Sequence, residues 1–200
     1  MRRLKRRKND PMPASLPVLQ TERLVLRGFD SSDAVDVFAY AQSPNVGPMA
    51  GWAAHASIEE SRAVVEMFIH DGDVWAVVDK KTGRVIGSIG LHLDKQRAVV
   101  GARELGFALG EANWGQGFAT EACKVVIAYA FEGLQCPVLS VGHFPANQKS
   151  KHVIKKLGFV FEGTFRHAFT LPDGAVTDDC RYSMLRAEYE AQKTSKNQSK

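Results

Sequence analysis

The chain is organised around the stretch Trp114-Gly115-Gln116-Gly117-Phe118-Ala119-Thr120-Glu121-Ala122, a glycine-rich turn that leads directly into a helical pattern. The residues before it, 99–109, are mostly apolar or small and predict a strand. After it, Phe118, Ala122 and Val125 recur at helical spacing. Such a junction directs backbone N–H groups and the positive end of a helix dipole at one point, and glycines let an anion approach the main chain. The stretch therefore predicts a phosphate-binding loop.

Two common phosphate-binding loops fit this stretch poorly. A Walker loop needs lysine and then serine or threonine where Gln116 and Gly117 stand. A dinucleotide-binding loop needs a third glycine where Thr120 stands and an acidic residue at the end of the next strand, which is absent at 137–142. Nucleoside triphosphate chemistry and NAD binding are therefore disfavoured. The structural alternative is a surface turn that caps a buried helix.

The loop resembles the pyrophosphate-binding loop of the GNAT acetyltransferases, [QR]-x-x-G-x-[GA], with Trp114, Gly117 and Ala119 at its three defined positions. Tryptophan departs from the general consensus, but it matches a subgroup similar to ribosomal-protein N-acetyltransferases, whose loop reads W-G-x-G-[YF]-A-T-E-A. The opening 21–27, T-E-R-L-V-L-R, resembles the start of that subgroup, and N-x-x-S at 147–150 and K-L-G-F at 156–159 follow in the family's order. The resemblance covers residues 21–188, nearly all of the chain that we expect to be ordered.

The pattern of periodicities and turns agrees with this family's fold. We expect an α/β (α+β) GNAT fold, a central mixed, mostly antiparallel twisted sheet of about seven strands with about four helices. Short turns imply an antiparallel meander, and the strand–helix–strand unit around the glycine loop implies one parallel pair. The expected strands are 21–27, 74–78, 85–93, 99–109, 138–141, 159–170 and 176–185, and the expected helices are 34–41, 57–70, 118–132 and 147–157.

Charge and composition divide the chain into three parts. We expect a basic, proline-rich disordered tail at 1–18, a single acetyltransferase domain at 19–190 and a polar disordered tail at 191–200. The whole chain has a formal net charge of +4, yet residues 11–190 carry 17 basic and 21 acidic side chains. An acidic body attracts cationic acceptors such as amines and disfavours nucleic-acid binding, except through the basic tail. The alternative for that tail is a solvated segment without a partner.

Several classes of protein are disfavoured by what the sequence lacks. No apolar run approaches the length of a membrane span, and the start lacks the apolar segment of a signal peptide. Three cysteines without C-x-x-C spacing indicate neither a disulfide framework nor a zinc site. We expect a cytoplasmic protein with reduced thiols, no membrane partner and no metal.

Direct acetyl transfer to an amine needs a base for the acceptor and an acid for the departing thiolate. Glu104 lies among apolar residues, which make a carboxylate a stronger base, and it matches the E-L-G-[FY] pattern of the subgroup. The alternative is a cross-strand ion pair with Arg103 or Arg97. The tyrosine that many GNAT enzymes use as acid is replaced by Ile154, so the resemblance implies Ser150 as the acid, against a packing role. His92 and His143 are secondary candidates for a base.

The resemblance also implies the remaining site residues and partners. Acetyl-CoA would be held by the glycine loop and by Asn147, and the alternative for Asn147 is a role only as a helix cap. The acceptor would be held by Trp52 and His55, and the alternative for these two residues is packing within their own loop. The predicted cofactor-binding residues are Trp114, Gly115, Gln116, Gly117, Phe118, Ala119, Thr120 and Asn147. The acceptor would be a protein N-terminal amine or a small-molecule amine, and a homodimer is common in the subgroup. The alternative function is a non-catalytic acyl-CoA-binding module with an RNA-contacting tail.

Overall fold

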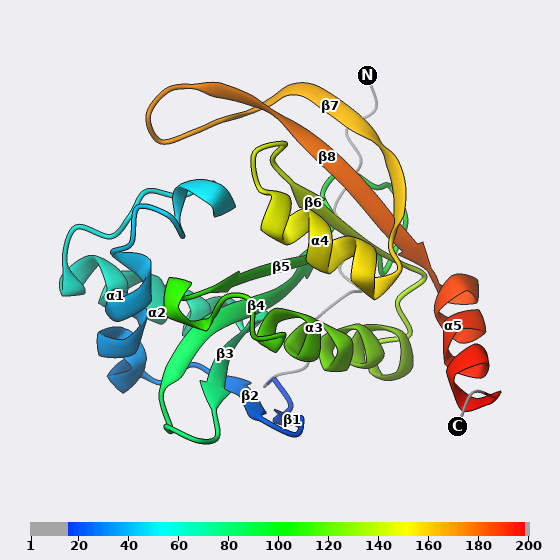
Figure 1. The fold of residues 1–200 in the computed structure, drawn as a ribbon, viewed down its shortest axis with the longest axis horizontal. Coiled ribbons are helices and arrows are strands. Elements are labelled where there is room, and N and C mark those ends of the chain that lie inside the picture. Colours follow the sequence, from blue (N-terminus) through cyan, green and yellow to red (C-terminus); the bar gives the residue numbers. More distant parts are fainter. Residues whose placement is uncertain (1–15, 199–200) are drawn as a thin grey trace.

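Eight strands form one continuous sheet in the order β1-β2-β3-β4-β5-β6-β8-β7 in the computed structural model, which describes residues 16–198 (Figure 1). Most of the predicted basic tail lies outside the described residues. The strands are β1 Leu19–Gln20, β2 Leu24–Gly28, β3 Val74–Asp79, β4 Val85–Leu93, β5 Arg103–Leu109, β6 Val138–His143, β7 Val160–Thr170 and β8 Val176–Leu185. The helices are α1 Ala34–Ala41, α2 Ile58–Asp71, α3 Phe118–Ala128, α4 Gln148–Leu157 and α5 Arg186–Gln198, with a π-helical turn at Tyr129–Gly133.

The sheet is antiparallel at every neighbouring pair except β5 and β6, which run parallel. The parallel pair is joined by α3, as the strand–helix–strand pattern predicts. The expected GNAT fold, with its mixed but mostly antiparallel sheet, is therefore confirmed. The structure adds the two-residue strand β1 and the helix α5 to the expected elements.

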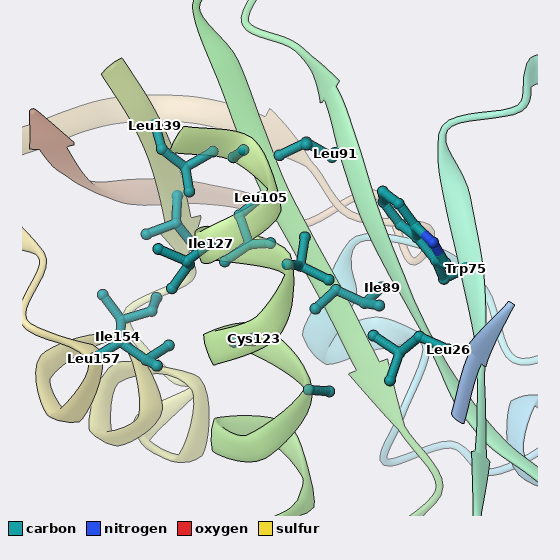
Figure 2. Close-up of a cluster of buried hydrophobic side chains, with 14 of the residues drawn as sticks. Leu26, Trp75, Ile89, Leu91, Leu105, Cys123, Ile127, Leu139, Ile154 and Leu157 are labelled. Atoms are coloured by element: carbon teal, nitrogen blue, oxygen red, sulfur yellow. The ribbon is translucent and has the colours of Figure 1, made fainter. Parts of the chain in front are cut away.

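Helices cover both faces of the sheet, so its central strands are apolar on both sides. In β3, Trp75 and Val77 pack toward α3 and α4, whereas Val74, Ala76 and Val78 pack toward α1 and α2. Figure 2 shows the first of these two clusters, in which Cys123 and Ile127 of α3 lie against side chains of the central strands. Burial on both faces explains why β3 lacks the polar–apolar alternation of a half-exposed strand.

The strand after the second turn is shorter than the sequence predicts. Val99 and Val100 are exposed, Gly101 has a φ of +81°, and the Ala102 N–H donates to the Val99 carbonyl across a turn, so β5 begins only at Arg103. The apolar character of 99–102 resembles a strand in sequence, but these residues have no neighbouring strand with which to pair.

The C-terminal segment also differs from the prediction, because α5 continues to Gln198 where we expected a disordered tail from 191. The Tyr189 ring stacks on Phe131 at a centroid distance of 4.8 Å, and its hydroxyl donates to Glu132 (2.7 Å). Lys193 also pairs with Glu132 (2.6 Å). Polar composition predicted disorder, whereas these contacts with a distant helix end stabilise α5. No helix among the described residues is both long and apolar enough to cross a membrane.

Candidate active site

The glycine loop has the backbone conformation that an anion site requires. Gly115 and Gly117 have φ angles of +74° and +83°, a region that side chains disfavour, and α3 begins directly afterwards at Phe118. The Glu121 N–H bonds back to the Gly117 carbonyl (3.0 Å), whereas the N–H groups of 118–120 have no acceptor among the described residues. These donors and the α3 dipole converge on the space beside the loop, as the sequence predicts.

The turn between β1 and β2, residues 21–23, contacts this loop and the start of α3. Arg23 donates to the Gln116 carbonyl (3.0 Å) and to the Glu121 carboxylate (2.7 Å), and its guanidinium lies 4.4 Å from the centre of the Phe118 ring. The Thr21 hydroxyl bonds to the same carboxylate (2.5 Å). The opening T-E-R motif therefore fixes the loop before any ligand binds, which reduces the ordering cost of binding.

The strands β5 and β6 diverge next to the loop, and we call the region between them the slot. The two strands pair only at Arg103 with Leu139 and at Glu104 with Ser140, although β5 continues to Leu109 and β6 to His143. Beyond Glu104, the edge of β5 that faces β6 has no strand partner over residues 105–109 within the described part of the chain, and the Leu109 carbonyl on it accepts the Trp114 side-chain N–H. An extended, amide-containing molecule can add to such an edge by main-chain hydrogen bonds. The slot therefore runs from the glycine loop to Glu104.

Glu104 lies where the two strands diverge, and its setting is ionic rather than apolar. Its Oε1 accepts a hydrogen bond from Nη1 of Arg181 in β8 (2.6 Å), and the same Nη1 contacts Oδ2 of Asp179 (3.1 Å). The guanidinium of Arg181 is only 7% exposed. The apolar surroundings predicted for Glu104 are therefore wrong. The arginine that pairs with Glu104 is Arg181, 77 residues away in the sequence. Arg97, one of the two partners that the sequence suggested, pairs instead with Asp94 and Glu162.

Two carboxylates share this one buried cation. Burial raises the pKa of Asp179, and the nearby Arg181 only partly offsets that effect. Burial alone would lower the pKa of Arg181, but its bonds to Glu104 and Asp179 outweigh burial and raise it. The cluster therefore has a net negative charge when both acids are ionised, which suits an incoming ammonium group. Nothing in the local sequence around 178–181 identified this role.

The start of α4 is tied to both sides of the slot. The Asn147 side chain accepts the Ser150 N–H (3.0 Å) as a helix cap and donates to the Met49 carbonyl (2.9 Å). The Lys149 ammonium lies 3.6 Å from the centre of the Trp114 ring, whose own N–H donates to the Leu109 carbonyl (2.8 Å). Asn147 therefore holds the half-buried Ser150, and Trp114 joins the glycine loop to α4.

Two side-chain positions that acyl transfer could use, those of Ile154 and Cys123, are buried away from solvent. Ile154 is fully buried in the core beside α3, so no proton donor stands at the position of the family's usual tyrosine. Cys123 is fully buried, and burial raises the pKa of its thiol, which disfavours the thiolate that a covalent mechanism would need. Among the described residues, no group of three or more His, Cys, Asp and Glu side chains could hold a metal ion.

Trp52 and His55, predicted to contact the acceptor, pack within their own loop between α1 and α2. The two rings lie 5.2 Å apart, and His55 Nδ1 bonds to the Ser61 hydroxyl (2.7 Å). His55 is buried, and burial lowers its pKa. The packing alternative therefore describes His55 well. The sequence did not identify Phe144 and Phe169, whose rings pack together at 5.3 Å where the β7–β8 hairpin meets this loop (Figure 1).

Comparison with known proteins agrees with this geometry. A family model described as the acetyltransferase (GNAT) domain matches residues 23–160, more than half of the chain. The chain belongs to the GNAT acetyltransferase family. A GNAT relative from Bacillus subtilis, the uncharacterised N-acetyltransferase YoaA, is 29% identical over 175 residues, 85% of this chain and 97% of YoaA. FsC-acetyl coenzyme A-N(2)-transacetylase of Aspergillus fumigatus is 32% identical over 87 residues, 43% of this chain and 37% of that protein.

A solved GNAT structure gives the same result at the level of the fold. The ribosomal-protein-S5-alanine acetyltransferase from Vibrio fischeri superposes with a TM-score of 0.71 at 26% identity, covering 85% of this chain and 97% of that one. Acetyltransferases with the GNAT fold use acetyl-CoA as the co-substrate, so this chain is an N-acetyltransferase by family. The loop N–H groups and the open edge of β5 fit a pyrophosphate and an amide-containing arm, respectively.

Proposed function

We propose that this protein transfers the acetyl group of acetyl-CoA directly to a primary amine, with Glu104 near the attacking nitrogen and Ser150 near the leaving thiolate. The observation that carries the proposal is the slot between β5 and β6, which lies between the unpaired N–H groups of the glycine loop and the two carboxylates at Arg181. The N–H groups of 116–120 would hold the pyrophosphate, and the open edge of β5 at 105–108 would bind the pantetheine arm.

The acceptor would enter from the face covered by α1 and α2. Glu104 shares that face with Ala108, which packs in the α1–α2 cluster, whereas Leu105 and Leu109 face α3. The net negative charge around Arg181 favours a cationic acceptor, and the transfer consumes its neutral form. One relative is named for a ribosomal protein and another for an FsC substrate, so a protein N-terminal amine is the first acceptor class to test and small amines the second.

Calorimetric titration with acetyl-CoA, CoA, ATP and NAD tests the cofactor part of the proposal. Saturable binding of the two CoA ligands alone is the expected result. In Gly117→Val, a β-branched side chain at a φ of +83° distorts the loop, and we expect at least about a tenfold loss of acetyl-CoA affinity. The matched control is Gly83→Val, since Gly83 also has a positive φ (+70°) and open space around it but lies in the turn between β3 and β4. Equal affinity in both variants would contradict the assignment of the loop.

Turnover tests the role of Glu104 separately. Glu104→Gln removes the carboxylate charge and keeps the size of the side chain, so kcat should fall about 10²-fold or more while the acetyl-CoA Kd stays near that of the wild type. The assay is release of free thiol in the presence of peptides with free N-termini and of small amines. An unchanged kcat at neutral pH would remove Glu104 from the reaction.

A further inference from the structure

A histidine–aspartate pair stands directly beside Glu104 on the acceptor face of the sheet. His92 in β4 is the cross-strand partner of Glu104 in β5. His92 Nδ1 bonds to Oδ2 of Asp73, the residue between α2 and β3, at 2.7 Å. Asp73 is anchored in turn, because its carbonyl accepts the Leu91 N–H (2.8 Å). The imidazole is therefore held from one nitrogen, which fixes the direction of the other.

The second nitrogen, Nε2, lies over a pair of glycines. A Cβ atom at Gly90 would stand 2.4 Å from Nε2, and one at Gly106 would stand 3.7 Å from it. Gly90 and Gly106 are themselves cross-strand partners, two pairs closer to the glycine loop than His92 and Glu104 and on the same face of the sheet. The ring thus lies back along β4, over Gly90, toward the end of the sheet that carries the glycine loop. Nε2 has no hydrogen-bond partner among the described residues, and no side chain at either glycine covers it.

The charged groups around His92 favour uptake of a proton. The hydrogen bond to Asp73 raises the pKa of His92 and outweighs the opposing effect of burial. The charges of Asp73 and Glu104 raise it further, and that of Lys95 lowers it slightly. On the far side of Glu104 lie Arg181 and Asp179 of β8. His143 of β6 packs against Tyr182, and its charge acts on Asp179 by lowering the pKa of that acid. One oxygen of Glu104 is already occupied by Arg181, whereas His92 Nε2 is open.

The reaction proposed above produces a proton that has to leave the acceptor side. An ammonium acceptor loses two protons overall while its nitrogen forms a bond to the acetyl carbon and the carbon–sulfur bond breaks. One of those protons balances the departing thiolate, and the other goes to solvent. His92 can release a proton to water, because its side chain is 45% exposed.

We propose that His92, oriented by Asp73, takes the acceptor's surplus proton at Nε2 and passes it to solvent. This inference rests on the proposed acetyl transfer and adds a proton exit to it. His92 acts in its neutral form, becomes an imidazolium as the amine loses its proton, and returns to the neutral form by giving that proton to water. Asp73 is a positioning residue, since it holds the ring and does not reach the acceptor itself.

The test is the pH profile of kcat/KM for the wild type, His92→Gln and Asp73→Asn, with His70→Gln on the exposed end of α2 as the matched control. His92→Gln should lower kcat/KM about 10²-fold at neutral pH without changing acetyl-CoA affinity. Since Asp73 raises the pKa of His92, Asp73→Asn should move the acid limb to lower pH. Added imidazole should restore part of the activity of His92→Ala.

Failure of this inference is distinguishable from failure of the proposed function. A wild-type protein that binds no acetyl-CoA overturns both proposals. An active wild type, with His92→Gln within about twofold of its rate and Asp73→Asn unchanged in pH profile, overturns the proton exit alone. Melting temperatures identify a variant that has lost its fold. If His92→Gln does not fold, the pH profile of Asp73→Asn decides whether His92 carries the proton to solvent.

Discussion

Replacing Arg181 by methionine would leave two carboxylates facing each other without their cation. The side chain of Arg181 is 7% exposed, those of Asp179 and Glu104 are 15% and 30% exposed, and one guanidinium nitrogen contacts both acids. Methionine retains most of the apolar volume and removes the charge. Removing one partner of a buried ion pair lowers the unfolding free energy by about 3–5 kcal/mol. Because Glu104 is partly exposed, we expect a loss of about 3 kcal/mol for this variant.

For a domain of this size, that loss corresponds to a Tm lowered by about 6–12 °C. The assay is urea unfolding followed by tryptophan fluorescence at pH 8 and at pH 5. Without Arg181, ionised Asp179 destabilises the folded state, and burial already raises its pKa. Protonation relieves the repulsion, so the deficit in unfolding free energy should be largest at pH 8 and shrink at pH 5. Adding Asp179→Asn to Arg181→Met should recover part of the loss at pH 8.

The matched control is Arg84→Met, which removes an arginine that is 60% exposed and paired with Asp36. A surface pair of this kind contributes about 0–1 kcal/mol. The reasoning about the buried cluster is refuted if Arg181→Met lies within about 1 kcal/mol of the wild type at pH 8, or if its deficit does not depend on pH. Should Arg181→Met fail to fold, Arg181→Lys provides a milder version of the same comparison.

Three further predictions concern other parts of the molecule. Ser150→Ala should lower kcat about 10²-fold at unchanged acetyl-CoA affinity, and full activity in the thiol-release assay would limit Ser150 to a packing role. Because burial lowers the pKa of His55, wild-type stability should fall as pH drops below its ordinary value of 6.5, and urea midpoints of His55→Gln should depend less on pH in that range. Tyr189→Ala removes the stack on Phe131 and the bond to Glu132, so α5 should lose hydrogen-exchange protection and the unfolding free energy of the domain should fall by about 1–2 kcal/mol. Unchanged protection would show that other contacts hold the helix.

The site was predictable where its properties are local. The glycine turn and the helix that follows it depend on neighbours within a few residues, so the pattern at 114–122 predicts them correctly. The same holds for the Asn147 cap of α4. These elements carry the resemblance to the family because the same local geometry requires the same residue types.

The partners of the candidate catalytic groups were not predictable in this way. Arg181 reaches Glu104 across 77 residues of sequence, and Asp73 reaches His92 across 19. Only the folded sheet places β8 two strands from β5, across β6, and the end of α2 beside β4. The apolar residues around Glu104 predict that the strand is buried, but they do not predict which charged side chain of another strand contacts Glu104. The prediction of an apolar setting failed for that reason.

The whole domain shows the same division between features that the local sequence determines and features that only the folded chain determines. Sequence alone determined the fold class, the glycine turn that leads into α3 and the order of the strands along the chain, since periodicity and glycine placement act through the local backbone. Tertiary structure decided the slot between β5 and β6, the ionic cluster at Arg181 and the ordering of α5 by Phe131 and Glu132. Each of these depends on contacts between segments far apart in the chain, whose free energy exists only once both segments are in place.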